Sequence, residues 1–248
     1  MARIEFWGGV GVIGSSKVLI HDGGHRVLLD LGLDIPRGSD LFRSPAALPR
    51  GRELSARLRV GAAPAMAGLY DPAALDPGDP LGEPAEPAAV FISHPHIDHV
   101  GLAGFLRADI PAYASPDAIA LLRALDHGGE TLPGPRDFSS AETSWRRMPA
   151  GAAVQVGPIR VERLDVDHDV PGASGYRVTT SDGVLAFTGD IGSTAITRSD
   201  RGPSPMPSPA AMSWSPRAPR SASTSTSRRG PRRTWPATPR RPSTAAPT

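Results

Sequence analysis

Four side chains of the kinds that bind metal ions lie within six residues, in the stretch HPHIDH at positions 94–99. The stretch directly follows the apolar run AVFIS, which is typical of a short buried strand. A loop at a strand end can turn His94 and His96 into one cavity and Asp98 and His99 toward a second position nearby. Neutral imidazoles and a carboxylate suit zinc, and also manganese or iron. The spacing therefore predicts a metal centre; the alternative is a polar turn whose histidines bind nothing.

HPHIDH resembles the HxHxDH signature of the metallo-beta-lactamase fold, a superfamily of metal-dependent hydrolases, and matches it at every required position. Three other residues occur in the order which that family uses. Asp30 in LLDLG resembles the acidic residue that ends an early strand and supports the metal loop from behind. His168 in DVDHDVPGASGY resembles the third histidine of the first metal site, and Asp190 in LAFTGD resembles the carboxylate shared by two metals. The resemblance covers residues 1 to about 192.

The resemblance implies two divalent metal ions, most simply zinc, with manganese as the second choice. The implied ligands are His94, His96 and His168 for the first ion, and Asp98, His99 and Asp190 for the second. Two ions roughly 3.5–4 Å apart lower the pKa of a bridging water and clamp the attacking and leaving oxygens. Asp98 would also orient or deprotonate that water, which makes it the predicted catalytic residue. The expected reaction is hydrolysis of an ester, an amide or a phosphodiester.

The N-terminal stretch WGGVGVIGSSKVLIHDGGHRVLLDLGL resembles the opening of the RNA-processing branch, the ribonuclease J and beta-CASP nucleases. SHPHIDHVGLAGFL is also similar to the corresponding stretch of that branch. The resemblance implies an RNA phosphodiester as substrate, with a hydrolase of small esters, lactones or thioesters as the alternative. No His follows His168, and there is no room for the beta-CASP domain. A truncated chain without catalytic activity is therefore a further alternative.

The elements that must position these residues are short strands and one clear helix. KVLI and RVLLDLG read as strands joined by a hairpin turn at Gly23 and Gly24. PAYAS is another short strand, and 153–190 gives two or three more, with a hairpin turn at 181–183. A helix is predicted from Ser115 as N-cap to Gly128 at its end. A shorter helix is expected around 53–60, and much of 61–89 reads as loop.

The last 48 residues differ from the rest of the chain. They contain nine Arg and no acidic residue, so residues 1–200 carry a net charge of −7 although the whole chain carries +2. They also lack Val, Leu, Ile, Phe and Tyr, and cannot offset their ordering entropy by burial. The expected fold class is α/β: an αββα metallo-beta-lactamase sandwich, truncated, with a disordered tail. The expected domains are a hydrolase domain over 1–198, incomplete at its C-terminal side, and the tail over 199–248.

The chain has 26 Arg and a single Lys, which indicates a GC-rich coding sequence. Such DNA read out of frame yields the Pro-, Ser-, Thr-, Arg- and Ala-rich composition of the tail, and we hypothesise that the frame is lost between Asp190 and Ser193. The alternative is a basic arm that binds RNA through its phosphates. The lack of Lys and of interleaved aromatic residues in the tail makes that arm a poor fit.

Composition excludes several classes of protein. The chain has no Cys, which excludes disulfide scaffolds and Cys-ligated zinc sites. No apolar run approaches the roughly 18 residues of a membrane span, and the N-terminus does not read as a signal peptide. We therefore expect a cytoplasmic protein without membrane association, and the oligomeric state stays open.

Overall fold

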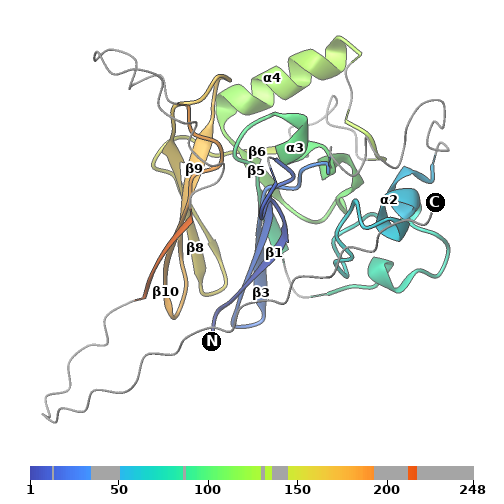
Figure 1. Ribbon diagram of the computed structural model, residues 1–248, viewed down its shortest axis with the longest axis horizontal. Helices are drawn as coiled ribbons and strands as arrows, with labels where there is room; N and C mark the ends of the chain where they lie inside the picture. The colour runs from blue at the N-terminus through green and yellow to red at the C-terminus, as the bar shows by residue number, and fades with distance from the viewer. Residues whose placement is uncertain are drawn as a thin grey trace, which may run out of the picture. The chain divides into compact units, whose positions relative to one another are not determined.

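Two β-sheets pack face to face, and helices cover the outer face of one of them (Figure 1). The structure is a computed structural model. It describes residues 1–12, 14–34, 51–85, 88–129, 132–135, 145–192 and the backbone of 212–216. The mixed α/β class predicted from the sequence is confirmed.

The first sheet combines an antiparallel and a parallel half. In spatial order it contains β1 (Arg3–Gly8), β2 (Lys17–Asp22), β3 (His25–Leu29), β4 (Ala88–Phe91), β5 (Ala112–Ala114) and β6 (Trp145–Arg147). The strands β1 to β3 pair antiparallel, and β3 to β6 pair parallel. The predicted hairpin joins β2 and β3, and both of its glycines have positive φ, which an L side chain adopts only with strain.

The second sheet is antiparallel throughout. Its spatial order is β11 (Met212–Pro216), β10 (Gly183–Phe187), β9 (Ser174–Thr179), β8 (Ile159–Asp165) and β7 (Ala153–Val156). The helices are α2 (Glu53–Arg59), α3 (Ile97–Val100) and α4 (Pro116–His127), with short 3-10 turns at Pro72–Ala74, Pro80–Gly82 and Ala103–Phe105.

Alternation along the strands of the first sheet divides the core in two. Val27 and Leu29 of β3 face the second sheet, whereas Leu28 between them faces the helices. Both faces of this sheet are therefore buried, which explains why its strands read as continuous apolar runs. The α4 helix packs Ile119 and Leu122 against the sheet. Its predicted N-cap is present, because Ala118 N donates to Ser115 Oγ at 3.0 Å.

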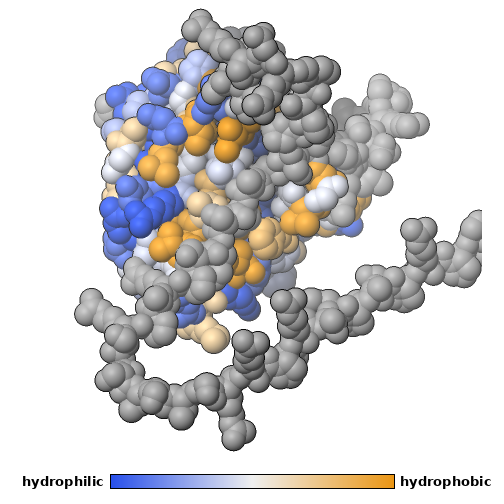
Figure 2. All heavy atoms as spheres, turned by 60° about the vertical axis from the view of Figure 1, so that its left-hand side comes forward, coloured by the Kyte–Doolittle hydropathy of each residue, from blue (hydrophilic) through white to orange (hydrophobic). Residues whose placement is uncertain are grey.

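The outer face of the second sheet is polar and charged over part of its area. Arg160 and Arg177 lie 2.7 and 4.0 Å from Glu162 there, while Leu164 on the same strand is 45% exposed. Figure 2 shows hydrophilic and hydrophobic side chains intermixed on the side of the molecule that carries this sheet. No helix among the described residues covers this face, so the described part of the chain contains three of the four layers predicted.

Most of the predicted tail lies outside the described residues. The exception is the backbone of β11, which pairs antiparallel with β10. Its sequence MSWSP alternates apolar and polar residues, but it lies in a segment that is otherwise poor in apolar residues. An unpaired sheet edge offers hydrogen bonds to any extended backbone, and this is why composition did not predict the strand. The chain divides into two units, Met1–Arg217 and Ala218–Thr248, whereas the predicted boundary at 198 stays a prediction. Within the described ranges, no helix is long and apolar enough to cross a membrane.

Candidate metal centre

The predicted ligands come together at one edge of the two sheets, on segments that follow strands. His94 and His96 lie in the loop after β4, and that loop runs directly into α3, which carries Asp98 and His99. His168 lies between β8 and β9, and Asp190 follows β10. Residues almost a hundred positions apart in the sequence thus meet because both sheets end at the same place.

Two groups of potential ligands share one histidine. The first, called the rim group below, is His94, His96 and His168; the second, called the buried group, is His94, His99 and Asp190. Within each group, one nitrogen or oxygen of every residue lies within 4.8 Å of the others. The ring centroids of the rim group are 4.7 to 5.2 Å apart. Such clusters of imidazole and carboxylate match the ligand chemistry of zinc.

A buried carboxylate holds the buried group from behind. Asp30 follows β3, is fully buried, and has a positive φ of 59°. It accepts hydrogen bonds from Ser93 N at 2.6 Å and Ser93 Oγ at 2.8 Å, and from His99 Nδ1 at 2.7 Å. The structure therefore places Asp30 directly against Ser93 and His99, and its role as a support for the metal loop stays a prediction.

Ser93 transmits the same constraint to His94. Because its hydroxyl donates to Asp30, the Oγ lone pairs can accept a hydrogen bond from His94 Nδ1–H, which lies 2.9 Å away. With both Nδ1 atoms engaged as donors, the Nε2 atoms of His94 and His99 are the ones left to face the cluster. Fixing a tautomer through the distal ring nitrogen is how proteins orient metal-binding histidines.

Two buried nitrogens test whether these residues suit a metal ion. Nε2 of His99 and Nε2 of His168 are buried and make no hydrogen bond within the described part of the chain. Nε2 of His99 lies 3.5 Å from an oxygen of Asp190 and 3.6 Å from an oxygen of Asp98. Nε2 of His168 lies 3.1 Å from an oxygen of Asp169. A buried nitrogen that makes no hydrogen bond is costly, and a cation would satisfy both nitrogens. The side chains fit a metal ion.

Electrostatics differ sharply between neighbouring histidines. Burial, reinforced by His99 and His96, lowers the pKa of His94 to about 2. Burial also opposes protonation of His99, but Asp30 and Asp190 outweigh it and raise its pKa to about 10. The close approach of the His99 imidazole in turn lowers the pKa of Asp190. Without a metal ion, a proton on His99 supplies positive charge to the buried group.

Asp98 belongs to neither group. Its side chain is 22% exposed, and its contact with the cluster is the 3.6 Å approach to Nε2 of His99. The structure thus brings His94, rather than Asp98, together with His99 and Asp190. The roles predicted for Asp98, as a ligand of the second ion and as the catalytic residue, stay predictions.

Sequence reasoning missed three residues of the centre. Ser93 was read only as the end of a strand. Asp169 lies 3.1 Å from Nε2 of His168 and 3.6 Å from Nε2 of His96, and so adds negative charge beside the rim group. Tyr176 on β9 donates to the carbonyl of Ile92 at 2.6 Å, which fixes the end of β4 against the second sheet. A hydroxyl directly before HPHIDH and an acid directly after His168 were the available signals.

Comparison with known proteins gives three consistent findings. A family model described as "Beta-lactamase superfamily domain" matches residues 25–202. Ribonuclease J of Mycolicibacterium smegmatis is 26% identical over 192 residues, which are 76% of this chain and 28% of that protein. Ribonuclease J of Sinorhizobium meliloti is 31% identical over 106 residues, which are 41% of this chain and 17% of that protein.

Among solved structures, a protein of unknown function from Enterococcus faecalis is similar with a TM-score of 0.58 and 25% identity. The match covers 76% of this chain and 43% of that one. The chain spans well under half the length of the ribonucleases J that it matches, from 17% to 38%.

Proposed function

The chain belongs to the beta-lactamase superfamily domain family, and from that membership we propose that it is a metal-dependent hydrolase of RNA phosphodiester bonds. The observation that carries the proposal is the arrangement of two ligand groups around His94, each with a buried Nε2 atom that makes no hydrogen bond within the described part of the chain.

We propose two divalent ions, most simply zinc. The proposed ligands are His94, His96 and His168 for one ion, and Asp98, His99 and Asp190 for the other, with Asp190 near both. When bound, such ions supply Lewis-acid activation of a water molecule. Asp30 and Ser93 hold the imidazoles in the tautomer that presents Nε2. Asp98, half-buried on α3, is the proposed residue that orients the attacking water or takes its proton.

The similarity to ribonucleases J supports RNA as the substrate, together with the glycine-rich N-terminal stretch that resembles theirs. A cytoplasmic location follows as part of the same proposal. Hydrolysis of small esters, lactones or thioesters is the alternative on the same fold, and a chain that turns nothing over is the other. We also propose that the hydrolase domain covers residues 1–198. We further propose that the reading frame is lost between Asp190 and Ser193.

Metal content and a substrate panel test the proposal. We expect the zinc-loaded protein to bind two equivalents by mass spectrometry and to cleave 5′-phosphorylated RNA but not lactones or thioesters. His168→Ala should lower both metal content and cleavage. His127→Ala, at the exposed end of α4, is the matched control and should change neither. Ester hydrolysis without RNA cleavage would favour the first alternative, and absence of both metal and turnover would favour the second.

A further inference from the structure

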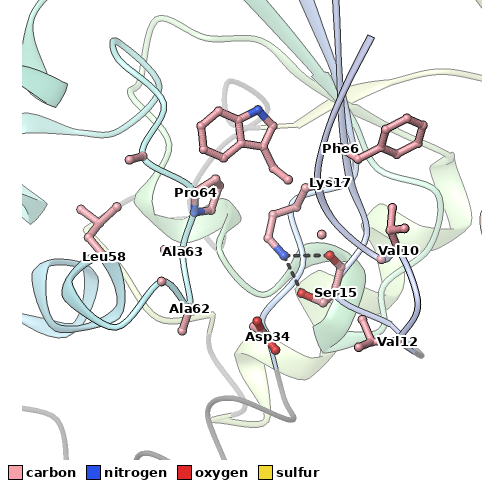
Figure 3. Close-up of a pocket in the computed structure, with 15 residues that line it drawn as sticks. Phe6, Val10, Val12, Ser15, Lys17, Asp34, Leu58, Ala62, Ala63 and Pro64 are labelled. Carbon is pink, nitrogen blue, oxygen red and sulfur yellow. Dashed lines mark hydrogen bonds between the residues drawn. The ribbon is translucent and has the colours of Figure 1, made fainter. Parts of the chain in front are cut away.

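A cavity of about 510 Å³ lies between the glycine-rich N-terminal loop and the segment after α2 (Figure 3). Leu58, Ala62, Ala63 and Pro64 lie along one side of the cavity, and Val10 and Val12 lie along the other (Figure 3). Trp7 also lines the cavity. In the part of the chain that the structure describes, nothing in the proposed chemistry of the metal centre uses this cavity.

Polar groups gather in the same cavity. Lys17, the one lysine of the chain, is 2% exposed, and its Nζ donates to Ser15 O at 2.8 Å and Ser15 Oγ at 2.7 Å. Asp34 lines the cavity close to them (Figure 3). Apolar walls with a few convergent polar groups are typical of small-molecule and nucleotide sites.

Large apolar side chains at the end of β1 and in the loop after it are exposed to solvent. Trp7 is 39% exposed and Phe6 is 54% exposed, and Val12 beside them is 44% exposed. Trp7 is also fixed in place, because its Nε1 donates to a carboxylate oxygen of Glu5 at 3.0 Å. An exposed, oriented indole offers a face on which a planar base can stack.

The same loop reaches the metal centre. Gly14 has a φ of +74° and packs so closely on Asp98 that a Cβ there would clash with the carboxylate. The loop therefore lines the cavity through Val10, Val12 and Ser15, and contacts a proposed catalytic residue through Gly14. A ligand in the cavity lies one loop away from the proposed site of hydrolysis.

We propose that this cavity binds one unpaired nucleotide of a single-stranded RNA whose scissile phosphodiester lies at the metal centre. The inference rests on the proposed function, because it takes RNA as the substrate. The base packs between Trp7 and the wall at Pro64. Lys17, held in place by Ser15, places a positive charge at the floor of the cavity, and Asp34 accepts from amino or ribose hydroxyl groups.

The charge of the folded part of the chain favours such an anchor over a broad basic groove. Residues 1–200 carry a net charge of −7, so general attraction for a polyanion does not hold RNA there. Base stacking is tolerant of sequence and depends little on net charge, and it can fix a strand where long-range electrostatics do not.

Binding of an RNA hexanucleotide to the full chain tests the inference, in the presence of EDTA, which withholds the metal ions that cleavage needs. Stacking of one base predicts that Trp7→Ala weakens binding by roughly 5- to 100-fold. Trp7→Phe should restore most of the affinity. Leu164→Ala removes a similarly exposed apolar side chain from the second sheet and should bind as the unchanged protein does. Equal affinity of Trp7→Ala and the unchanged protein would overturn the inference.

A second pair of variants tests the inference independently of whether Trp7→Ala folds. Val12→Glu places a negative charge at the exposed cavity wall and should weaken binding, whereas Leu125→Glu at a comparably exposed site on α4 should not. A duplex of the same sequence should bind far more weakly than the single strand; equal binding would contradict an unpaired base in the cavity.

The two proposals fail in distinguishable ways. If the zinc-loaded protein leaves RNA intact but binding still depends on Trp7, the proposed hydrolysis is wrong and the cavity stands. If RNA is cleaved and Trp7→Ala changes neither affinity nor KM, the cavity is wrong and the hydrolysis stands.

Discussion

The two ligand groups of the candidate metal centre share His94 but are held in very different ways. In the buried group, His99 is fully buried and its Nδ1 is fixed by Asp30. In the rim group, the His96 side chain is 41% exposed and the nearest carboxylate, Asp169, is 73% exposed. The buried group is therefore set by the protein before any ligand arrives, whereas the rim group depends more on the ion itself for its final geometry.

Asp30→Asn should have the largest effect, because it removes the charge that holds the buried group. The amide would turn an N–H₂ toward Ser93 Oγ or His99 Nδ1, where the carboxylate now accepts. Removing one partner of a buried pair costs about 3–5 kcal/mol, and we expect that loss of unfolding free energy in urea.

Zinc affinity, measured by calorimetry on the same variant, should fall roughly 10- to 100-fold. Asp109→Asn, which breaks an exposed ion pair with Arg107, is the control and should cost less than about 1 kcal/mol. Similar losses in the two variants would remove the contrast between the buried and rim groups.

Gly14→Ala should come next, because its Cβ displaces Asp98, which stands beside the buried group. Gly11→Ala is a close control, since its φ of +73° imposes the same backbone strain but nothing lies within 4 Å of its Cβ. Strain alone costs roughly 1–2 kcal/mol in both variants. We expect RNA cleavage to fall about tenfold or more in Gly14→Ala alone. Equal activity in the two variants would argue that Asp98 has no part in the chemistry.

The stability of the metal-free protein should depend on pH in opposite ways through His99 and His94. The folded pKa of His99, about 10, lies above the ordinary 6.5, so its stabilisation is complete below pH 6.5 and is lost as the pH rises toward 10. The folded pKa of His94, about 2, lies below 6.5, so its contribution is present above pH 6.5 and is lost as the pH falls.

Together these two groups favour a stability maximum near pH 6.5, measured by urea unfolding in EDTA. His99→Gln should remove most of the decline on the alkaline side and leave the acid side in place. A stability that keeps rising up to pH 9 would contradict the assignment of opposite shifts to these two histidines.

Asp169→Asn should have the smallest effect, since the carboxylate is exposed and its ion pairs within the described ranges are with the rim group. Its loss should change unfolding free energy by less than about 1 kcal/mol and weaken zinc binding a few-fold. The quantity to measure is the ratio of the zinc affinities of this variant and of Asp30→Asn. A larger loss in Asp169→Asn would reverse the order of the two groups.

Local signals predicted much of this molecule. The α4 helix was predicted because its cap, its first-turn proline and its terminal glycine are neighbours in the sequence. The hairpin at Gly23 and Gly24 was predicted for the same reason. HPHIDH stood out because its four potential ligands lie on one short loop.

Features set by tertiary packing were not predicted. The region 61–89 read as loop, yet Tyr70 is fully buried and its hydroxyl donates to Pro64 O at 2.7 Å. The sharing of His94 between two groups depends on where His168 and Asp190 arrive from the second sheet. Neither position follows from spacing along the chain, because sheet packing brings them together.

The long sequence separations within the centre bear on how the protein folds. Asp30 and Ser93 are 63 residues apart, Asp30 and His99 are 69 apart, and Ile92 and Tyr176 are 84 apart. Closing such loops has an entropic cost that only completed sheets can offset. In an unfolded chain, an ion could bind little more than the neighbouring ligands of HPHIDH, because the other ligands are far away in the sequence. We therefore expect the metal centre to assemble late in folding. Metal would then slow unfolding far more than it speeds refolding.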